Sequence, residues 1–240
     1  MPMTLHTKVA LVTGGTRGIG LAIASSLMTA GAHVAITGKD AGHLSAARRR
    51  LEEIGGGAAL ETFQADVRSW ADTERTLAAV VNRFGGLDVL VNNAGIGVFT
   101  PVADMTPAQW SEIIDTNLTG VFHYCHAAIP HLRARGGGYI INISSLAGKN
   151  AFVGAGAYCA SKAGLNALSE VLMQELRYDG IRVSYVMPGS VATGFGGDER
   201  KGADWKSSAD DVAQVVLDLL HMHPRSLPSR VEIRPSKPAK

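Results

Sequence analysis

Short runs of β-branched and other apolar residues alternate with segments of helical periodicity along all 240 residues. The runs lie at 9–14, 33–37, 58–65, 88–93, 139–144, 182–188 and 230–235. This alternation is typical of a parallel sheet with helices on both faces, because a helix must carry the chain back between parallel strands. With no linker or internal repeat, the sequence predicts one α/β domain over residues 1–240. We expect a doubly wound, three-layer sandwich with a seven-stranded parallel sheet.

Two helix starts are signalled by capping residues. Thr106, Pro107 and Gln109 have the spacing of a capping box, with proline at the first helical position. Ser208 precedes two aspartates, which predicts a second capped start with an acidic first turn.

Charge and composition exclude several classes of function. The 23 basic and 21 acidic residues are interspersed, so we expect no nucleic-acid surface. No apolar run reaches the roughly 18 residues of a membrane span, and we expect neither a membrane segment nor a signal peptide. Two cysteines cannot make a disulfide framework, which fits a cytoplasmic protein.

Histidine spacing and charge content give two further expectations. His123 and His126 are three apart and His221 and His223 are two apart, but no third ligand is spaced to match, so we expect no metal site. Charged residues make up 18%, below the roughly 25% of soluble domains. This deficit leaves apolar surface to cover and favours subunit contacts.

The glycines of "TGGTRGIG" (13–20) follow the first expected strand and open the first expected helix. Gly14, Gly18 and Gly20 let the backbone turn sharply and approach a pyrophosphate, whose charge suits the free amides of a helix N-terminus. A tight turn without a ligand is the alternative, since a glycine pattern alone is weak. Its place between strand and helix favours a dinucleotide and a Rossmann-type fold.

The residues after the second expected strand favour NADP(H). An acid there would bind the ribose 2′-hydroxyl of NAD, whereas a basic residue accommodates the 2′-phosphate of NADP. Lys39 follows the strand, and Arg17 in the glycine loop is a second candidate for the phosphate. Asp40 is the alternative, an NAD-selecting acid, but it falls beyond the strand and is expected to start a turn.

Tyr158 and Lys162 lie four residues apart in a segment expected to be helical. Residues at this spacing share a helix face, so the phenol and the ammonium can act on one point. The pair is common by chance and is weak evidence when it stands alone.

With the glycine loop and the Tyr–Lys pair, the chain resembles the short-chain dehydrogenase/reductase family from Lys8 to about Pro235. The motifs that carry the resemblance are "TGGTRGIG" (13–20), "ADV" (65–67), "NNAG" (92–95), "TNLTG" (116–120), "NISS" (142–145), "YCASK" (158–162) and "PGSVAT" (188–193). The resemblance implies NADPH-dependent reduction of a ketone or aldehyde, a 3-ketoacyl thioester being one candidate. It also implies a homodimer or homotetramer.

The resemblance further implies Ser145, Tyr158 and Lys162 as a catalytic triad, with Asn117 as a fourth member. Ser145 is preferred to Ser144 because it lies thirteen residues before the tyrosine. The cofactor-binding residues that the resemblance implies are Gly14, Thr16, Arg17, Gly18, Ile19, Gly20, Lys39, Asp66, Val67, Asn93, Ala94, Gly95, Tyr158, Lys162, Pro188, Gly189, Val191 and Thr193.

In this assignment Tyr158 is the general acid, or the base in the oxidative direction. A free phenol has a pKa of about 10, so working near neutrality needs a drop worth roughly 4 kcal/mol. A cation about 4 Å away at an effective dielectric of 20 supplies about that much, so we expect Lys162 to lower the pKa of Tyr158. Ser145 would orient the substrate oxygen. Asn117, a poor helix former, would mark a distorted helix, or would simply be exposed.

Two stretches depart from the family pattern: a short glycine-rich loop at 194–207, expected to form a mobile lid, and a basic tail at 235–240. Residues that could form an apolar substrate wall, or could equally be plain core, are Phe99, Leu146, Phe152, Val153 and Phe195. The alternative function is a nucleotide-binding redox sensor without turnover. The intact triad favours an enzyme.

Overall fold

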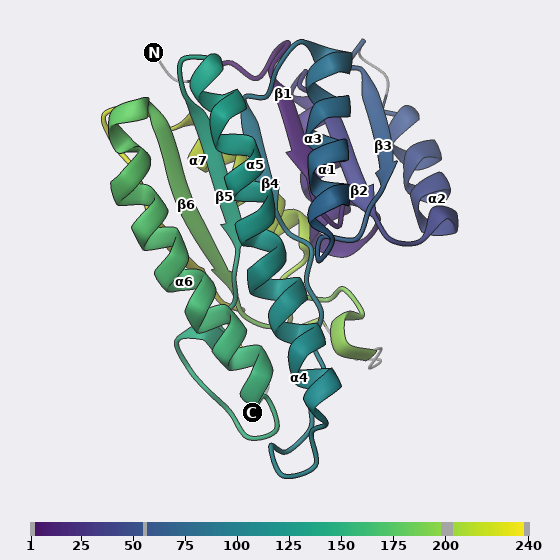
Figure 1. The fold of residues 1–240 in the computed structure, drawn as a ribbon, viewed down its shortest axis with the longest axis vertical. Coiled ribbons are helices and arrows are strands. Elements are labelled where there is room, and N and C mark those ends of the chain that lie inside the picture. The colour runs from purple at the N-terminus through teal and green to yellow at the C-terminus, as the bar shows by residue number, and fades with distance from the viewer. Residues whose placement is uncertain (1–2, 55–56, 198–203, 238–240) are drawn as a thin grey trace.

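The computed structural model describes residues 3–54, 57–197 and 204–237, and the strands in these ranges form one parallel sheet in the order β3-β2-β1-β4-β5-β6-β7 (Figure 1). The strands are β1 Val9–Val12, β2 His33–Gly38, β3 Leu60–Gln64, β4 Val89–Asn92, β5 Gly138–Ile143, β6 Ile181–Pro188 and β7 Arg230–Ile233. The predicted α/β fold with a seven-stranded parallel sheet is confirmed. Each predicted strand end lies within about two residues of the observed one, the usual scatter of such boundaries.

Helices pack on both faces of the sheet (Figure 1). They are α1 Gly18–Thr29, α2 Ala41–Glu52, α3 Trp70–Phe84, α4 Pro107–Ile114, α5 Gly120–Ala134, α6 Gly156–Leu176 and α7 Ala209–His221. The two predicted helix starts are confirmed. Thr106 and Gln109 form a capping box before α4, and Ser208 and Asp211 form one before α7.

Alternate residues of the strands enter two hydrophobic cores, one on each face of the sheet. In β1, Ala10 and Val12 join the core under α1, α2 and α7, whereas Val9 and Leu11 join the core under α3, α5 and α6. All four are at most 1% exposed, because side chains alternate faces along a strand and both faces here are covered. This explains the uninterrupted apolar sequence of the strand.

The direction in which strands are added to the sheet reverses between β1 and β4, which are neighbours. Loops that leave the carboxyl ends of these two strands therefore diverge and open a crevice, where ligands of doubly wound folds bind. The glycine loop follows β1 and the "NNAG" segment follows β4, so both meet at this crevice.

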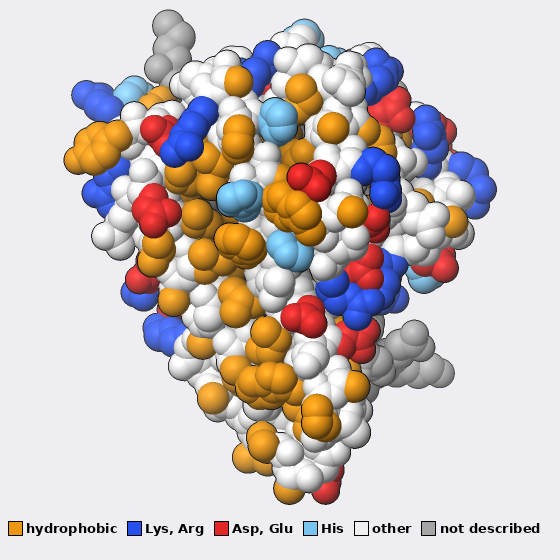
Figure 2. Space-filling view, in the orientation of Figure 1, with side chains coloured by type: hydrophobic (Ala, Val, Ile, Leu, Met, Phe, Trp, Pro, Cys, Tyr) orange, Lys and Arg blue, Asp and Glu red, His pale blue; other side chains and the backbone are white. Residues whose placement is uncertain are grey.

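The face that carries α4, α5 and α6 displays many hydrophobic side chains among its charged ones (Figure 2). Exposed large apolar residues of these helices include Trp110, Phe122 and Val171. Within the described residues, no helix combines the length and apolar character that crossing a membrane requires. The same residues contain no group of three or more His, Cys, Asp or Glu side chains arranged to hold a metal ion.

Candidate active site

The glycine loop between β1 and α1 leaves an open helix N-terminus. Arg17 is the N-cap residue of α1, yet its side chain caps no backbone amide, and no acid lies in the first turn. The first amides of a helix lack partners within the helix and carry its positive dipole end, so this terminus suits an anion.

Asn93 holds the glycine loop against the segment that follows β4. Its side-chain amide donates to the carbonyl oxygens of Thr13 at 3.1 Å and Gly14 at 3.0 Å. A Cβ on Gly20 would overlap both that amide and the Gly14 carbonyl, so only glycine fits there. The loop is thus a tight cradle closed by Asn93, which fits the predicted dinucleotide.

Tyr158 and Lys162 lie on the first turns of α6, and both side chains are buried. The Lys162 ammonium donates a hydrogen bond to the Ile143 carbonyl at 2.9 Å and lies 5.9 Å from the centroid of the Tyr158 ring. Lys162 also lies beside Gly95, where a Cβ would be 3.7 Å from its nitrogen. The spacing predicted from the sequence therefore places the two groups at the carboxyl end of β5.

Ser145 caps the short 3₁₀ turn Leu146–Gly148, and its hydroxyl accepts the Ala147 amide at 3.1 Å. The Ser145 side chain also lies within hydrogen-bonding reach of the Tyr158 phenol, and this contact acts to lower the pKa of the phenol. Ser144 points away and donates to the Asn166 side chain at 2.5 Å. Of the two serines, Ser145 is the one whose side chain contacts the Tyr158 phenol.

Burial dominates the electrostatics of this pair. It raises the pKa of Tyr158, with the hydrogen bond from Ser145 opposing the shift. It lowers the pKa of Lys162 to about 8. The expectation that Lys162 lowers the pKa of Tyr158 is therefore wrong for this arrangement, since the cost of placing a phenolate in a poorly hydrated site outweighs the attraction of the ammonium. At neutral pH the phenol keeps its proton and the ammonium its charge.

Asn117 lies behind the triad in a π-helix, Asp115–Thr119, inserted between α4 and α5. Its fully buried side chain accepts the Ile96 amide at 2.8 Å and donates to the Ile96 carbonyl at 2.9 Å. It also donates to the Ser161 hydroxyl at 3.1 Å. The predicted helix distortion is confirmed, and the alternative of an exposed asparagine is wrong.

A pocket of about 660 Å³ unites the triad with part of the glycine loop. Predicted site residues that line it are Arg17, Gly18, Ile19, Asn93, Gly95, Ser145, Tyr158, Lys162, Pro188, Gly189, Val191 and Thr193. Predicted residues that do not line it are Gly14, Thr16, Gly20, Lys39, Asp66, Val67, Ala94 and Asn117. The first set surrounds Ser145, Tyr158 and Lys162, and the second lies behind that part of the pocket or toward β2 and β3.

Aromatic rings surround the phenol. The Phe99 and Phe195 rings lie 5.8 Å and 5.7 Å from the Tyr158 ring, and Phe152 lies 6.0 Å from Phe99. Together with Leu146 they line the pocket, so of the two alternatives that the sequence left open, an apolar wall agrees better with their positions than plain core. Val153 does not: it is 98% exposed, so its assignment to the wall is wrong.

Lining residues that were not expected from the sequence include Ala147, Asn150, Arg234 and Pro235, whereas Trp205 and Lys206 belong to the predicted lid, 194–207. Arg234 and Pro235 follow β7, so the start of the chain's last segment borders the pocket. No motif marks these positions, because they reach the pocket only through the pairing of β7 with β6. The predicted lid, 194–207, lies partly outside the described residues, as does the predicted tail, 235–240.

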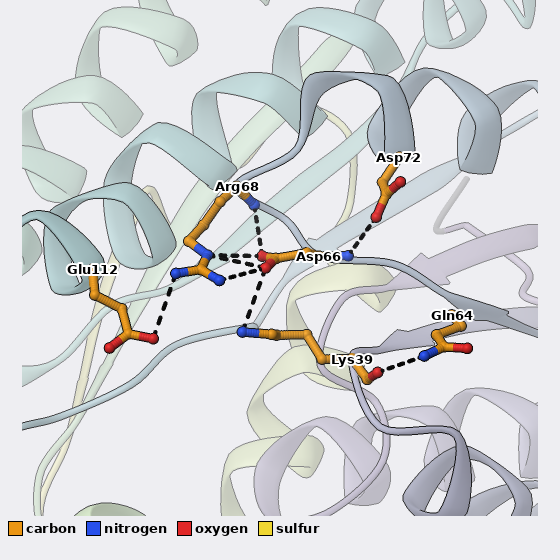
Figure 3. A network of polar contacts seen from close by, with 6 residues as sticks. All are labelled: Lys39, Gln64, Asp66, Arg68, Asp72 and Glu112. Atoms are coloured by element: carbon orange, nitrogen blue, oxygen red, sulfur yellow. Dashed lines mark hydrogen bonds and ion pairs between the residues drawn. The ribbon is translucent and has the colours of Figure 1, made fainter.

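At the ends of β2 and β3, Lys39 and Asp66 belong to a polar network (Figure 3). The Lys39 ammonium lies 3.4 Å from the Asp66 carboxylate. Arg68 makes the closer contacts with that carboxylate, the shortest at 2.6 Å, and was not expected from the sequence. Asp40, the alternative acid, caps α2 and accepts the His43 amide at 2.7 Å, which agrees with the turn predicted for it.

Comparison with known proteins agrees with this geometry. A family model described as short chain dehydrogenase matches residues 8–204. The chain is 32% identical to an uncharacterised oxidoreductase of Staphylococcus saprophyticus, over 96% of this chain and 98% of that protein. It is 42% identical to an acetoacetyl-CoA reductase of Rhizobium meliloti (strain 1021), over 78% of this chain and 75% of that enzyme.

Solved structures share the whole fold. A metagenomic short-chain oxidoreductase in complex with NADP has a TM-score of 0.85 and 37% identity, over 98% of this chain and 100% of that one. An NAD⁺-bound xylitol dehydrogenase has a TM-score of 0.89 and 27% identity, with the same coverage. From the family model, the relatives and the fold together, this chain belongs to the short-chain dehydrogenase family of oxidoreductases.

Proposed function

We propose that this protein reduces a ketone or aldehyde to an alcohol with NADPH, and that Tyr158 gives the proton. One observation carries the proposal: Ser145, Tyr158 and Lys162 line a single pocket whose wall also includes the start of α1. A substrate carbonyl in this pocket can therefore lie beside both a proton donor and a dinucleotide.

Bound NADPH would supply the hydride for the carbonyl carbon. Ser145 would donate a hydrogen bond to the carbonyl oxygen and hold it beside the phenol. Tyr158 keeps its proton at neutral pH, because burial raises its pKa, and would pass it to the oxygen as negative charge develops there. The Lys162 ammonium, 5.9 Å from the ring centroid, would stabilise the phenolate left behind.

The cofactor end of the site supports NADPH. The amides at the N-terminus of α1 would hold the diphosphate, and Gly20 and Asn93 shape the cradle for it. β2 ends at Gly38 with no carboxylate, and Lys39 follows. The carboxylate of Asp40 is engaged in capping α2. Lys39 and Arg17 would then bind the 2′-phosphate.

The pocket wall supports a substrate with an apolar part. Phe99, Phe152 and Phe195 are each between 40% and 53% exposed although they line a pocket, so an apolar group bound there would remove their rings from water. The relative that is named an acetoacetyl-CoA reductase supports a 3-ketoacyl thioester as one such substrate.

The test is incubation of the purified protein with NADPH or NADH and a panel of ketones, aldehydes and 3-ketoacyl thioesters. The expected result is oxidation of NADPH with at least one carbonyl, and slower oxidation of NADH. A protein that binds NADPH tightly but oxidises it with no member of the panel would instead be a redox-sensing regulator. Equal or tighter binding of NADH would contradict the proposed cofactor preference.

A further inference from the structure

Two cations share the carboxylate of Asp66 unequally (Figure 3). The guanidinium of Arg68 donates from Nε to both oxygens, at 3.1 and 3.0 Å, and from Nη2 to Oδ2 at 2.6 Å. The backbone amide of Arg68 adds a bond at 3.0 Å. Lys39 makes only an ion contact with Oδ2, at 3.4 Å. The arginine is therefore the principal partner of Asp66.

Arg68 is itself held in place from a second side. Its Nη1 lies 3.4 Å from a carboxylate oxygen of Glu112, on α4. The backbone of Asp66 is fixed as well, since its amide donates to Asp72 at 2.9 Å. Burial opposes ionisation of Asp66, but the hydrogen bonds from Arg68 and the charge of Lys39 bring its pKa to about 2. Asp66 is thus a full negative charge already matched by a fork of hydrogen bonds.

Since Arg68 neutralises Asp66, the positive charge of Lys39 is only weakly engaged by that carboxylate. Its side chain is 59% exposed, and an exposed ion pair at 3.4 Å contributes little to stability, so an incoming anion can draw the ammonium away. Its backbone stays in place, because the Lys39 carbonyl accepts a hydrogen bond from Gln64 at 2.9 Å. Without Arg68, Lys39 would be the only cation on Asp66 and would be held by it.

We infer that Arg68 determines cofactor choice without touching the cofactor: by neutralising Asp66, it releases Lys39 to bind the 2′-phosphate of NADPH. Arg68 is a positioning residue in this account, and Lys39 makes the contact. The inference rests on the proposed preference for NADPH. It adds that an uncompensated Asp66 would both retain Lys39 and repel the phosphate.

The experiment compares dissociation constants of NADPH and NADH by fluorescence titration, and of 2′,5′-ADP and 5′-AMP by calorimetry. Arg68→Gln should weaken NADPH and 2′,5′-ADP by about tenfold, with NADH and 5′-AMP little changed. The double variant Arg68→Gln/Asp66→Asn has no carboxylate to hold Lys39. It should therefore restore the wild-type ratio of the NADPH dissociation constant to the NADH dissociation constant (the NADPH to NADH ratio). The double variant leaves no carboxylate without its arginine, so it still tests the inference if Arg68→Gln alone fails to fold.

Arg75→Gln is the matched control. Arg75 lies on the neighbouring α3, pairs with Asp72 at 2.9 Å, and carries the same charge. It should leave the NADPH to NADH ratio unchanged, whereas a loss equal to that of Arg68→Gln would mean that only net charge matters and would overturn the inference.

Lys39→Met and the wild type together separate this inference from the proposed function. If Arg68 acts only through Asp66 and Lys39, adding Arg68→Gln to the double variant Lys39→Met/Asp66→Asn should change the ratio no further. A further loss, or no rescue by Asp66→Asn, would show that Arg68 binds the phosphate itself and would overturn the inference alone. An unchanged ratio in Lys39→Met would show that Lys39 does not bind the phosphate and would also overturn the inference, whereas a wild-type protein that binds NADH as tightly as NADPH would contradict the proposed function.

Discussion

At the scale of single residues, the site depends on a lysine whose charge is costly to keep. Lys162 is 4% exposed, and the Ile143 carbonyl is its hydrogen-bond acceptor. Burial lowers its pKa from 10.5 to about 8, so its ammonium is less stable in the folded protein than in the unfolded chain. A pKa shifted in this way is typical of functional sites, and it makes the free energy of unfolding depend on pH.

Between pH 8 and 10.5 the unfolded chain holds a proton that native Lys162 has released, so this lysine makes the free energy of unfolding rise with pH there. Replacing Lys162 with Met removes the effect. The stability difference between variant and wild type should therefore shift in favour of the wild type by on the order of 3 kcal/mol from pH 7 to 10.5. Denaturant titrations at several pH values measure it, and a difference independent of pH would contradict it.

At the scale of elements, the π-helix Asp115–Thr119 exists where Asn117 leaves the regular helix to bind the backbone of Ile96. These two hydrogen bonds between the Asn117 side chain and the Ile96 backbone, here called the clamp, tie the segment after β4 to the helix that leads into α5. A π-bulge within a helix often marks a functional site, and this one lies next to α6, which carries Tyr158 and Lys162.

Replacing Asn117 with Ala would leave the Ile96 amide and carbonyl without their side-chain partner, whereas the Ser161 hydroxyl would keep the Tyr158 carbonyl as its acceptor. Since an unsatisfied buried group costs about 1–3 kcal/mol, the free energy of unfolding of the variant should be lower by about that amount, and its denaturant midpoint should fall accordingly. Asn82→Ala, at an exposed position of α3, is the control and should be neutral or slightly stabilising, because alanine favours helix. Equal stability of the Asn117 variant and the wild type would show that the clamp is dispensable.

Elements were also what the sequence predicted best. Strands buried on both faces appear as apolar runs, and the capping residues of α4 and α7 act within four residues of sequence. Contacts between distant segments could not be predicted in this way. Asn117 was expected to distort its helix, but its partner Ile96 lies 21 residues away, and periodicity holds no information on such pairs.

At the scale of the whole molecule, the apolar face of α4, α5 and α6 suggests how copies associate (Figure 2). Phe122 is 49% exposed, and the centroid of its ring lies 5.6 Å from that of His126. The ring of Trp70, from α3, lies 5.4 Å from the His126 ring, centroid to centroid. Exposed apolar clusters of this kind commonly mark interfaces. We therefore expect the predicted homo-oligomer to use this face.

Phe122→Asp should shift sedimentation from a dimer or tetramer toward the monomer, because an interfacial carboxylate would be buried without a partner. Tyr178→Asp is the control: Tyr178 is 93% exposed beyond the end of α6, and its change should leave the assembly intact. A variant at Phe122 that sediments like the wild type would place the interface elsewhere.

The full extent of the pocket was visible only in the folded molecule. The motifs before residue 194 predicted the triad and the glycine loop, and the triad and part of that loop line one pocket. Arg234 and Pro235 join it because β7 pairs beside β6, and Arg68 matters because it meets Asp66 across a turn. The error on the pKa of Tyr158 has the same origin, since the degree of burial depends on the whole fold.

The most direct test of the account is the turnover of Tyr158→Phe with NADPH and the best carbonyl substrate of the panel. The account predicts that kcat falls by about 10²–10⁴-fold, the contribution of a general acid, while the dissociation constant of NADPH and the unfolding midpoint stay near those of the wild type. A variant that binds NADPH and reduces the carbonyl at the wild-type rate would contradict the central claim that the Tyr158 phenol supplies the proton.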